Sequence, residues 1–340
     1  FGNRKPPSAA YATQSPILYY DEEEGLFIGG NFWDGRATGE RLGNPAADQA
    51  LGPFLNPVEQ NNPSKEAVLM QVAASKYAAL WEQVWGEPIS IETEADIEKN
   101  YDRIGLAIAA YEASSEVNQF SSKYDHYLRG EVDLTEQEER GRKLFNGKAM
   151  CSACHPSQSE NGEPPLFTDF TFDNLGVPRN PENPASIADP AWRDPGLGHF
   201  LSTVSGFAEY ADPNLGKSKV PTLRNVGLGS CEAQELDDSK KGRKGKKGKC
   251  ITKAYMHNGF FKSLKSVVHF YNTRDVKPTC ESLDIYDATE AVALANDCWP
   301  EPEVAENVNT DELGDLGLTD EEEDALVTFM MAMSDGYLKK

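Results

Sequence analysis

Apolar residues recur at helical spacing in several stretches of the chain, and each stretch follows a residue that can cap a helix. Helices are predicted after Ser64 and after Thr93, where Asp96 completes the capping pattern, and their apolar faces are expected to be buried. The two faces consist of Val68, Leu69 and Val72 in the first helix and of Ile97, Tyr101, Ile104, Ile108 and Tyr111 in the second. These helices predict a mainly helical N-terminal region.

The same pattern predicts two helices in the C-terminal part. One begins after Thr135, with Glu138 three residues on, and the other begins after Thr319, with Glu322 in the same position. Their small and apolar contact positions are Gly141, Leu144 and Phe145 in the first and Leu326, Phe329, Met330 and Met333 in the second. A polar stretch from Lys123 to Asp133 precedes both helices, so we expect domains over residues 1–128 and 129–340.

Composition narrows the classes of partner. The 340 residues carry a net charge of −22, which argues against a nucleic-acid partner, and no apolar run approaches the length of a membrane span. The basic stretch 239–249 breaks this acidic trend. It is interpreted as a solvated loop, or alternatively as an electrostatic docking site for an acidic partner or surface.

The stretch from Cys151 to His155 has the CxxCH pattern that attaches a c-type haem. Its two thiols lie one helical turn apart, where both can reach one porphyrin, and His155 is the predicted iron ligand. A redox thiol pair or half of a zinc site is the alternative. The first would favour a βαβ setting and the second another Cys/His pair at close spacing, and neither pattern occurs in the sequence.

The other four cysteines fall into two pairs that each bracket a polar loop, Cys231 with Cys250 and Cys280 with Cys298. We expect two disulfides and therefore an oxidising compartment. The sequence begins at Phe1 without a hydrophobic leader, as a mature or trimmed secreted product would. The expected location is the periplasm, or a secreted or cell-surface state.

Several motifs together carry a family resemblance. They are Phe32–Ala37, Gln49–Pro53, Asn56–Glu59, the CxxCH, Val220–Val226, Tyr255–Gly259 and Leu264–Tyr271. In this order they resemble the bacterial di-haem cytochrome c peroxidase and MauG family over nearly the whole chain. The resemblance implies two cytochrome c-like helical domains with long loops, in an enzyme that transfers electrons.

Family members carry a first CxxCH upstream of the segment that resembles Arg4–Ser8, and the sequence starts just after that point. We therefore expect the second haem on an N-terminal segment that is cleaved, outside the given sequence or on a separate polypeptide, with a one-haem variant as the alternative. The retained residues Gln49, Pro53 and Glu59 favour a peroxide-binding haem beside residues 1–128.

The resemblance also implies roles for single residues. Glu59 would shuttle a proton between the peroxide oxygens, Gln49 would hydrogen-bond the bound oxygen ligand, and Pro53 would shape the pocket. Trp33 resembles the tryptophan between the two haems and is the expected electron relay. Tyr271 matches the sixth-ligand position of the MauG-like branch, where peroxidases place methionine. The alternative is a packed Tyr271, with Met256, Met330 or His269 as the ligand.

A calcium ion is a further expectation from the resemblance. Thr252 and Ala254 match the positions whose backbone carbonyls bind calcium in the family. The asparagine position, however, appears as Lys5, which cannot coordinate a cation while protonated, so Asn3 or water would have to replace it.

The sequence thus predicts a haem oxidoreductase that reduces hydrogen peroxide, in which a small cytochrome c or a cupredoxin feeds the His155 haem and Trp33 passes electrons on. One alternative is MauG-like, peroxide-dependent oxidation of a protein or organic substrate, which Tyr271 favours. Another is a mono-haem electron carrier without catalysis. A homodimer is compatible with each of these functions.

Overall fold

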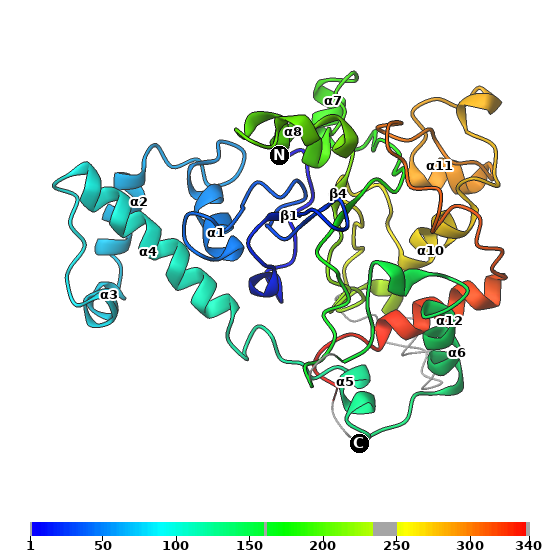
Figure 1. Ribbon diagram of the computed structural model, residues 1–340, viewed down its shortest axis with the longest axis horizontal. Helices are drawn as coiled ribbons and strands as arrows, with labels where there is room; N and C mark the ends of the chain where they lie inside the picture. Colours follow the sequence, from blue (N-terminus) through cyan, green and yellow to red (C-terminus); the bar gives the residue numbers. More distant parts are fainter. Residues whose placement is uncertain (1, 160–161, 234–249, 338–340) are drawn as a thin grey trace. The chain divides into compact units, whose positions relative to one another are not determined.

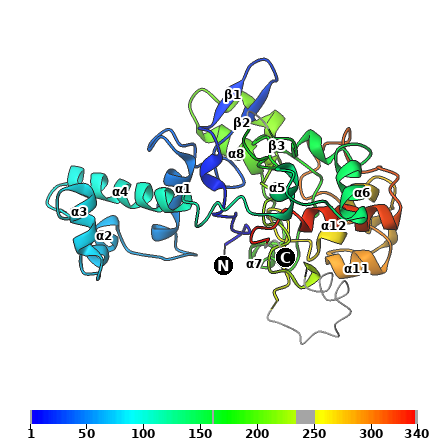
Figure 2. The same cartoon turned by 90° about the horizontal axis from the view of Figure 1, so that it is seen from below.

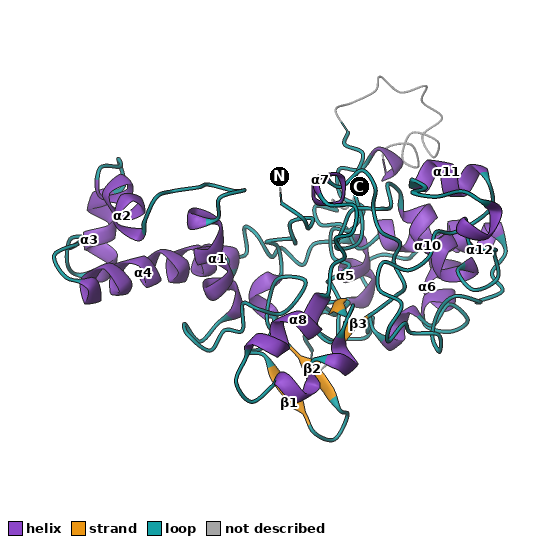
Figure 3. Ribbon diagram, turned by 90° about the horizontal axis from the view of Figure 1, so that it is seen from above, coloured by secondary structure: helices purple, strands orange, loops and turns teal. Residues whose placement is uncertain are grey.

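The chain is rich in helices and poor in strands, as the sequence predicts. The computed structural model describes residues 2–159, 162–233 and 250–337 (Figure 1). In this part of the chain the strands form two small two-stranded sheets, and helices and loops make up the rest (Figure 3). The basic stretch 239–249 lies outside the described residues. Contacts group the chain into two compact units, unit 1 with Ser8–Asn118 and unit 2 with Asn3–Pro7 and the residues from Gln119 on.

Unit 1 combines a hairpin with a group of helices. The hairpin pairs β1 (Tyr19–Asp21) with β2 (Leu26–Ile28) in antiparallel register (Figure 2). The helices are η1 (Ala12–Gln14), α1 (Pro45–Leu55), α2 (Lys65–Ala73), α3 (Ala78–Trp85) and α4 (Glu94–Glu112). The pairs α1 with α4 and α2 with α4 pack against each other.

Two helix starts in unit 1 confirm the capping predictions. The Ser64 hydroxyl accepts a hydrogen bond from the Ala67 amide at the start of α2, and Thr93 does the same for Asp96 in α4. Both apolar faces are buried over most of their length. Tyr111 is a correction, because it is 56% exposed and its hydroxyl donates a hydrogen bond to Glu116 at 3.3 Å. It lies in the last turn of α4, outside the apolar cluster that covers the rest of this face.

Unit 2 contains the CxxCH motif and consists of helices joined by long loops. Its α-helices are α5 (Lys123–Leu128), α6 (Glu136–Phe145), α7 (Pro184–Ala188), α8 (Gly196–Thr203), α10 (Leu264–Thr273), α11 (Glu290–Ala295) and α12 (Asp320–Met331). Short 3-10 turns are η2 (Cys151–Ala153), η3 (Ala208–Tyr210), η4 (Asp212–Asn214) and η5 (Glu281–Leu283). The strands β3 (Phe172–Asp173) and β4 (Ser218–Lys219) pair antiparallel.

The helices α6 and α12 pack together, and both begin as predicted. Thr135 with Glu138 and Thr319 with Glu322 form complete capping boxes. The two helices lie side by side (Figure 1), and their apolar residues belong to the core of unit 2. Gly141 allows this packing, because a Cβ atom there would meet the Ala325 carbonyl oxygen at 2.0 Å. The helix that precedes the CxxCH motif is therefore in direct contact with the last helix of the chain.

Both predicted disulfides are present. Cys231 bonds to Cys250, and Cys280 bonds to Cys298. Each bond closes a loop of the polypeptide within unit 2. Over the described ranges, none of the helices has the length and apolar character that a membrane crossing requires.

Candidate haem site

The CxxCH motif forms a compact turn in unit 2. Met150 takes a left-handed backbone conformation, with φ of 54°, and directs the chain from α6 into the 3-10 turn η2. The amide of His155 then donates a hydrogen bond to the Cys151 carbonyl at 2.9 Å. The thiols of Cys151 and Cys154 are free, in contrast to the four cysteines that form disulfides.

The environment of the two thiols distinguishes the alternatives for this motif. Burial raises the pKa of Cys151 to about 12, and burial together with the negative charge of Asp169 raises the pKa of Cys154 to about 12. Reactive thiol pairs have lowered pKa values. These surroundings therefore argue against a redox thiol pair, and they suit sulfurs that are held as neutral thioethers.

His155 has the orientation that an iron ligand requires. Its Nδ1 atom lies 2.7 Å from the backbone carbonyl oxygen of Phe167. Because a carbonyl only accepts hydrogen bonds, Nδ1 carries the proton and Nε2 keeps its lone pair. Burial also lowers the pKa of His155, which favours the neutral imidazole that binds metals.

Tyr271 lies on α10, near both thiols of the motif. Burial raises the pKa of Tyr271, and the charges that Cys154 and Cys151 would carry raise it further. Its hydroxyl finds no hydrogen-bond partner among the described residues, so the oxygen is available to an iron atom. Two free thiols, an oriented imidazole and this phenol fit a c-type haem, whose bound iron would supply one-electron redox chemistry.

Two acidic side chains lie beside Cys154. Its sulfur and carboxylate oxygens of Asp173 and Glu312 lie within 4.8 Å of one another. The Asn309 side chain donates to both carboxylates, at 2.6 Å each. Burial raises the pKa of Asp173. These groups belong to the surroundings of the haem motif and place acidic oxygens beside one of its attachment points.

The site residues predicted from the peroxidase resemblance lie in unit 1. Trp33 is 8% exposed, in the segment after β2. Gln49 and Pro53 are half-buried on α1, whereas Glu59 is exposed in the loop that follows. That loop folds back on the helix, since the Gln60 amide donates to the Pro53 carbonyl at 3.1 Å. The roles assigned to Trp33, Gln49 and Glu59 stay predictions.

Two lysines lie among the residues expected at a calcium site. Thr252 and Ala254 flank Lys253, whose ammonium group donates to the carbonyl oxygens of Asn225 and Val226 at 3.0 Å each. Burial lowers the pKa of Lys253, and the nearby positive charge of Lys5 lowers it further. The calcium site at Thr252 and Ala254 stays a prediction.

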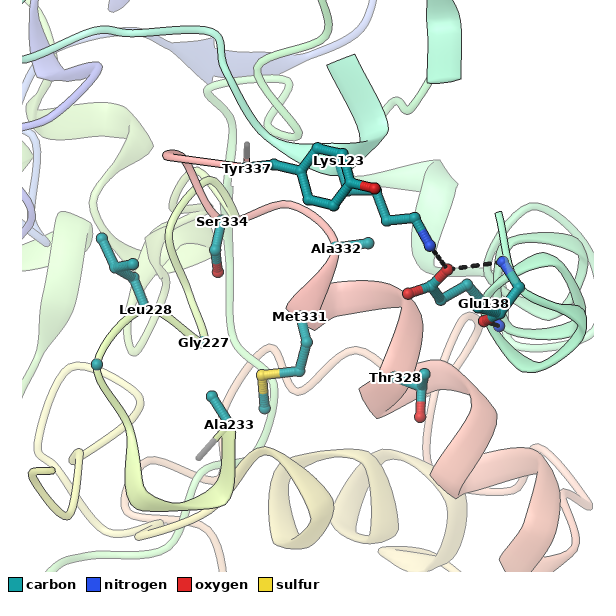
Figure 4. Close-up of a pocket in the computed structure, with 12 residues that line it drawn as sticks. Lys123, Glu138, Gly227, Leu228, Ala233, Thr328, Met331, Ala332, Ser334 and Tyr337 are labelled. Carbon is teal, nitrogen blue, oxygen red and sulfur yellow. Dashed lines mark hydrogen bonds and ion pairs between the residues drawn. The ribbon is translucent and has the colours of Figure 1, made fainter. Parts of the chain in front are cut away.

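A separate pocket of about 390 Å³ lies between α5, α6 and α12 (Figure 4). Lys123 and Glu138 form an ion pair at its edge, and Thr328 and Met331 line it from α12. None of the residues predicted to bind haem lines this pocket. The Glu138 carboxylate also accepts from the Thr135 amide, so the ion pair is part of the helix cap.

Two functional features escape the sequence interpretation. The Phe167 carbonyl that orients His155 is a backbone group with no sequence signature. Arg224, in the Val220–Val226 motif, forms a buried ion pair with Asp125, and their side chains are 0% and 1% exposed. The motif pointed to this segment in the sequence, but the sequence does not show that Arg224 pairs with Asp125.

The chain is similar in sequence and structure to known haem proteins. The family model described as di-haem cytochrome c peroxidase matches residues 1–133. The methylamine utilization protein MauG of Paracoccus denitrificans is 33% identical and aligns with 98% of this chain and 75% of its own length. The cytochrome-c peroxidase IdrP2 of Denitromonas iodatirespirans is 27% identical, over 78% of this chain and 62% of its own. The diheme peroxidase BthA of Burkholderia thailandensis superposes with a TM-score of 0.72 at 28% identity, over 98% of this chain and 73% of BthA.

Proposed function

The chain is a member of the di-haem cytochrome c peroxidase and MauG family of haem oxidoreductases, and we propose that unit 2 binds one c-type haem through Cys151, Cys154 and His155. The haem would be attached by thioether bonds to the two cysteines. His155 would bind its iron through Nε2.

The observation that carries this proposal is the geometry of His155. Its Nδ1–H donates to the Phe167 carbonyl, so the ring presents Nε2 as the ligand atom. A histidine that only filled the core would gain nothing from two free, partly buried thiols on the turn just before it. The three groups together favour haem attachment over each alternative.

Tyr271 is the proposed sixth ligand. Its hydroxyl lies near both thiols and has no partner in the described part of the chain. His269 is a weaker candidate, because its Nδ1 atom lies 2.9 Å from a Glu323 carboxylate oxygen. A bound iron cation would favour the phenolate form of Tyr271, in spite of the raised pKa. A phenolate stabilises ferric iron relative to a thioether.

The proposed reaction is peroxide-dependent. Glu59 would take up and return a proton as the oxygen–oxygen bond of hydrogen peroxide breaks, and Gln49 would donate a hydrogen bond to the oxygen. Both are assigned to the pocket of the peroxide-reactive second haem that the family carries. Trp33 would pass electrons, since an indole can be oxidised and reduced without breaking a bond.

The electron source distinguishes two versions of this function. In the peroxidase version, a small cytochrome c or cupredoxin delivers electrons to the His155 haem. In the MauG-like version, oxidising equivalents are consumed by a protein or organic substrate. Tyr271 and the 33% identical MauG relative support the second version. A mono-haem carrier without catalysis stays a third candidate.

The proposed location is periplasmic or extracellular, supported by the two disulfides in unit 2. Calcium is not assigned a role, because Lys5 and Lys253 make its expected position unfavourable. A homodimer is likewise not assigned.

The proposal is tested on the purified holoprotein. Intact mass and a pyridine haemochrome assay should show covalent haem, and replacing Cys154 by serine should leave the haem with a single thioether bond. Rapid mixing of the wild-type holoprotein with hydrogen peroxide should show a fast change in the haem spectrum. Absence of covalent haem would refute the binding site. A haem-loaded protein that does not react with peroxide would refute the peroxide-dependent function and favour the electron carrier without catalysis.

The role of Glu59 is tested with a matched pair of variants. Glu59→Gln removes the proton-transferring group and should slow the peroxide reaction by about 10²- to 10⁴-fold. Glu92→Gln makes the same chemical change at another exposed glutamate of unit 1 and should leave the rate unchanged. Equal rates in the two variants would remove Glu59 from the mechanism.

A further inference from the structure

The Phe167 carbonyl, which orients His155, accepts a second hydrogen bond. The Leu223 amide donates to the same oxygen at 3.3 Å. Phe167 itself has a left-handed backbone, with φ of 53°, and its side chain is fully buried. A phenylalanine adopts this conformation rarely, so the surrounding contacts must hold it in place.

Those contacts come from the segment around Leu223, which runs beside residues 165–168. The Arg224 Nε–H donates to the Pro165 carbonyl at 2.8 Å, and the Thr222 hydroxyl donates to the Leu166 carbonyl at 2.6 Å. Counted with the Leu223 amide, donors from 222–224 thus hold three consecutive carbonyl groups. The backbone on both sides of the His155 acceptor is fixed by one short segment.

Arg224 is fixed in turn at its other end. Its two terminal nitrogens donate to the two carboxylate oxygens of Asp125, at 2.8 and 3.1 Å. Asp125 belongs to the capping box of α5, where Ser122 donates to the same carboxylate. The guanidinium also lies over the Phe120 ring, 4.5 Å from its centroid. A helix start therefore anchors the arginine that holds the Phe167 turn.

We propose that Arg224 and Thr222 are positioning residues that set the direction and strength of the hydrogen bond from His155 to Phe167, and through it the reduction potential of the haem. This inference rests on the haem site proposed above. A strong hydrogen bond from Nδ1–H makes the imidazole a better electron donor at Nε2, which stabilises ferric iron. Loosening the Phe167 turn should therefore raise the potential.

The test uses holoprotein variants and measures the midpoint potential of the His155 haem. Thr222→Val removes one hydroxyl donor and changes no charge. Arg224→Lys keeps the charge and loses the two-pronged pairing with Asp125. Thr328→Val is the control, because it removes a hydroxyl that also donates to a backbone carbonyl, that of Asp324 at 2.8 Å, in α12.

We expect Thr222→Val and Arg224→Lys to raise the potential, by up to about tenfold in the equilibrium between ferric and ferrous forms, or ~59 mV for one electron. Thr328→Val should leave it unchanged. In NMR spectra, the His155 Nδ1 proton should also exchange faster with solvent in the first two variants. This second measurement reports on the hydrogen bond itself and not on activity.

Three results would overturn the inference. One is a potential and an exchange rate in Thr222→Val and Arg224→Lys that match the control. Another is a rise in a third variant, Arg224→Gln, that Thr222→Val and Arg224→Lys do not show, which would indicate a charge effect of the guanidinium. The third is a changed potential with an unchanged Nδ1 exchange rate. If Arg224→Gln does not fold, the two conservative variants decide. Wild-type protein without covalent haem would refute the proposed function instead.

Discussion

Replacing Gly141 by alanine tests whether the close contact of α6 and α12 maintains the unit that carries the haem motif. Gly141 lies within α6 and has ordinary helical backbone geometry. An added Cβ atom would lie 2.0 Å from the Ala325 carbonyl oxygen and 2.8 Å from the Phe329 Cβ atom. Because the first neighbour is backbone, a side-chain rotation cannot relieve the overlap. The two helices would have to move apart.

The sign of the effect follows from two opposing contributions. Alanine is favoured over glycine inside a helix by about 1 kcal/mol. Overpacking a core costs about 1–3 kcal/mol, and a backbone overlap belongs at the upper end, ~3 kcal/mol. The net loss of unfolding free energy is then about 2 kcal/mol. For a unit of this size, roughly 2–4 °C per kcal/mol gives a melting temperature lower by about 4–8 °C.

The measurement is thermal unfolding of the holoprotein, followed by circular dichroism and by the haem absorbance. Gly52→Ala is the control, because Gly52 also lies inside a helix, α1, where a Cβ would make only an ordinary 3.4 Å contact with the Phe32 ring. That variant should lower the melting temperature less than Gly141→Ala does, because its main cost is the restriction that the following Pro53 places on a residue with a Cβ atom. A Gly141→Ala protein that melts at or above the wild-type temperature would refute the steric reasoning.

Three further predictions concern charge, ligation and calcium. Burial raises the pKa of Asp125, but its hydrogen bonds and charge interaction with Arg224 outweigh burial and leave that pKa below the ordinary value. The carboxylate therefore stabilises the fold fully above the unfolded-state pKa of about 3.9, and this stabilisation is lost as the pH falls through the folded-state pKa. Urea midpoints should therefore fall below about pH 4 in the wild type and less steeply in Asp125→Asn, and parallel acid slopes would contradict this. Tyr271→Met should raise the midpoint potential of the haem, because a thioether favours ferrous iron, whereas the control Tyr286→Phe, at a 68% exposed tyrosine, should not; an unchanged potential in Tyr271→Met would remove Tyr271 as the ligand. Because Lys5 and Lys253 already supply positive charge, a calcium chelator should not lower the melting temperature, and a clear drop that added calcium reverses would restore the calcium site.

Local signals in the sequence predict the helices of this protein well. The capping residues Ser64, Thr93, Thr135 and Thr319 each begin a helix as expected, since a cap depends on neighbours only three residues away. Both disulfide pairs are confirmed. They could be predicted because each pair brackets a short loop. The prediction that Tyr111 lies on a buried helix face is wrong, because such a face depends on more than local spacing. Helical spacing gives the side of the helix a residue lies on, but not where the core beside that helix ends.

Contacts between distant segments could not be predicted in this way. The carbonyl that orients His155 belongs to a residue whose left-handed backbone is held from residues 222–224, and Arg224 pairs with Asp125, 99 positions earlier in the chain. The sequence contains these side chains but does not show which backbone groups they meet. The motif that includes Arg224 signalled importance without a physical reason, and the contacts with residues 165–168 now supply one.

The cysteines of unit 2 provide one more argument for the haem site. Four of them are bonded in disulfides, which indicates folding under oxidising conditions. Cys151 and Cys154 form no disulfide, although they lie only three positions from each other. Burial raises the pKa of both thiols. Reactive redox pairs have lowered thiol pKa values, so redox exchange does not explain the position of Cys151 and Cys154. Thioether bonds to a haem do explain it, because they use both sulfurs without requiring a thiolate in the folded protein.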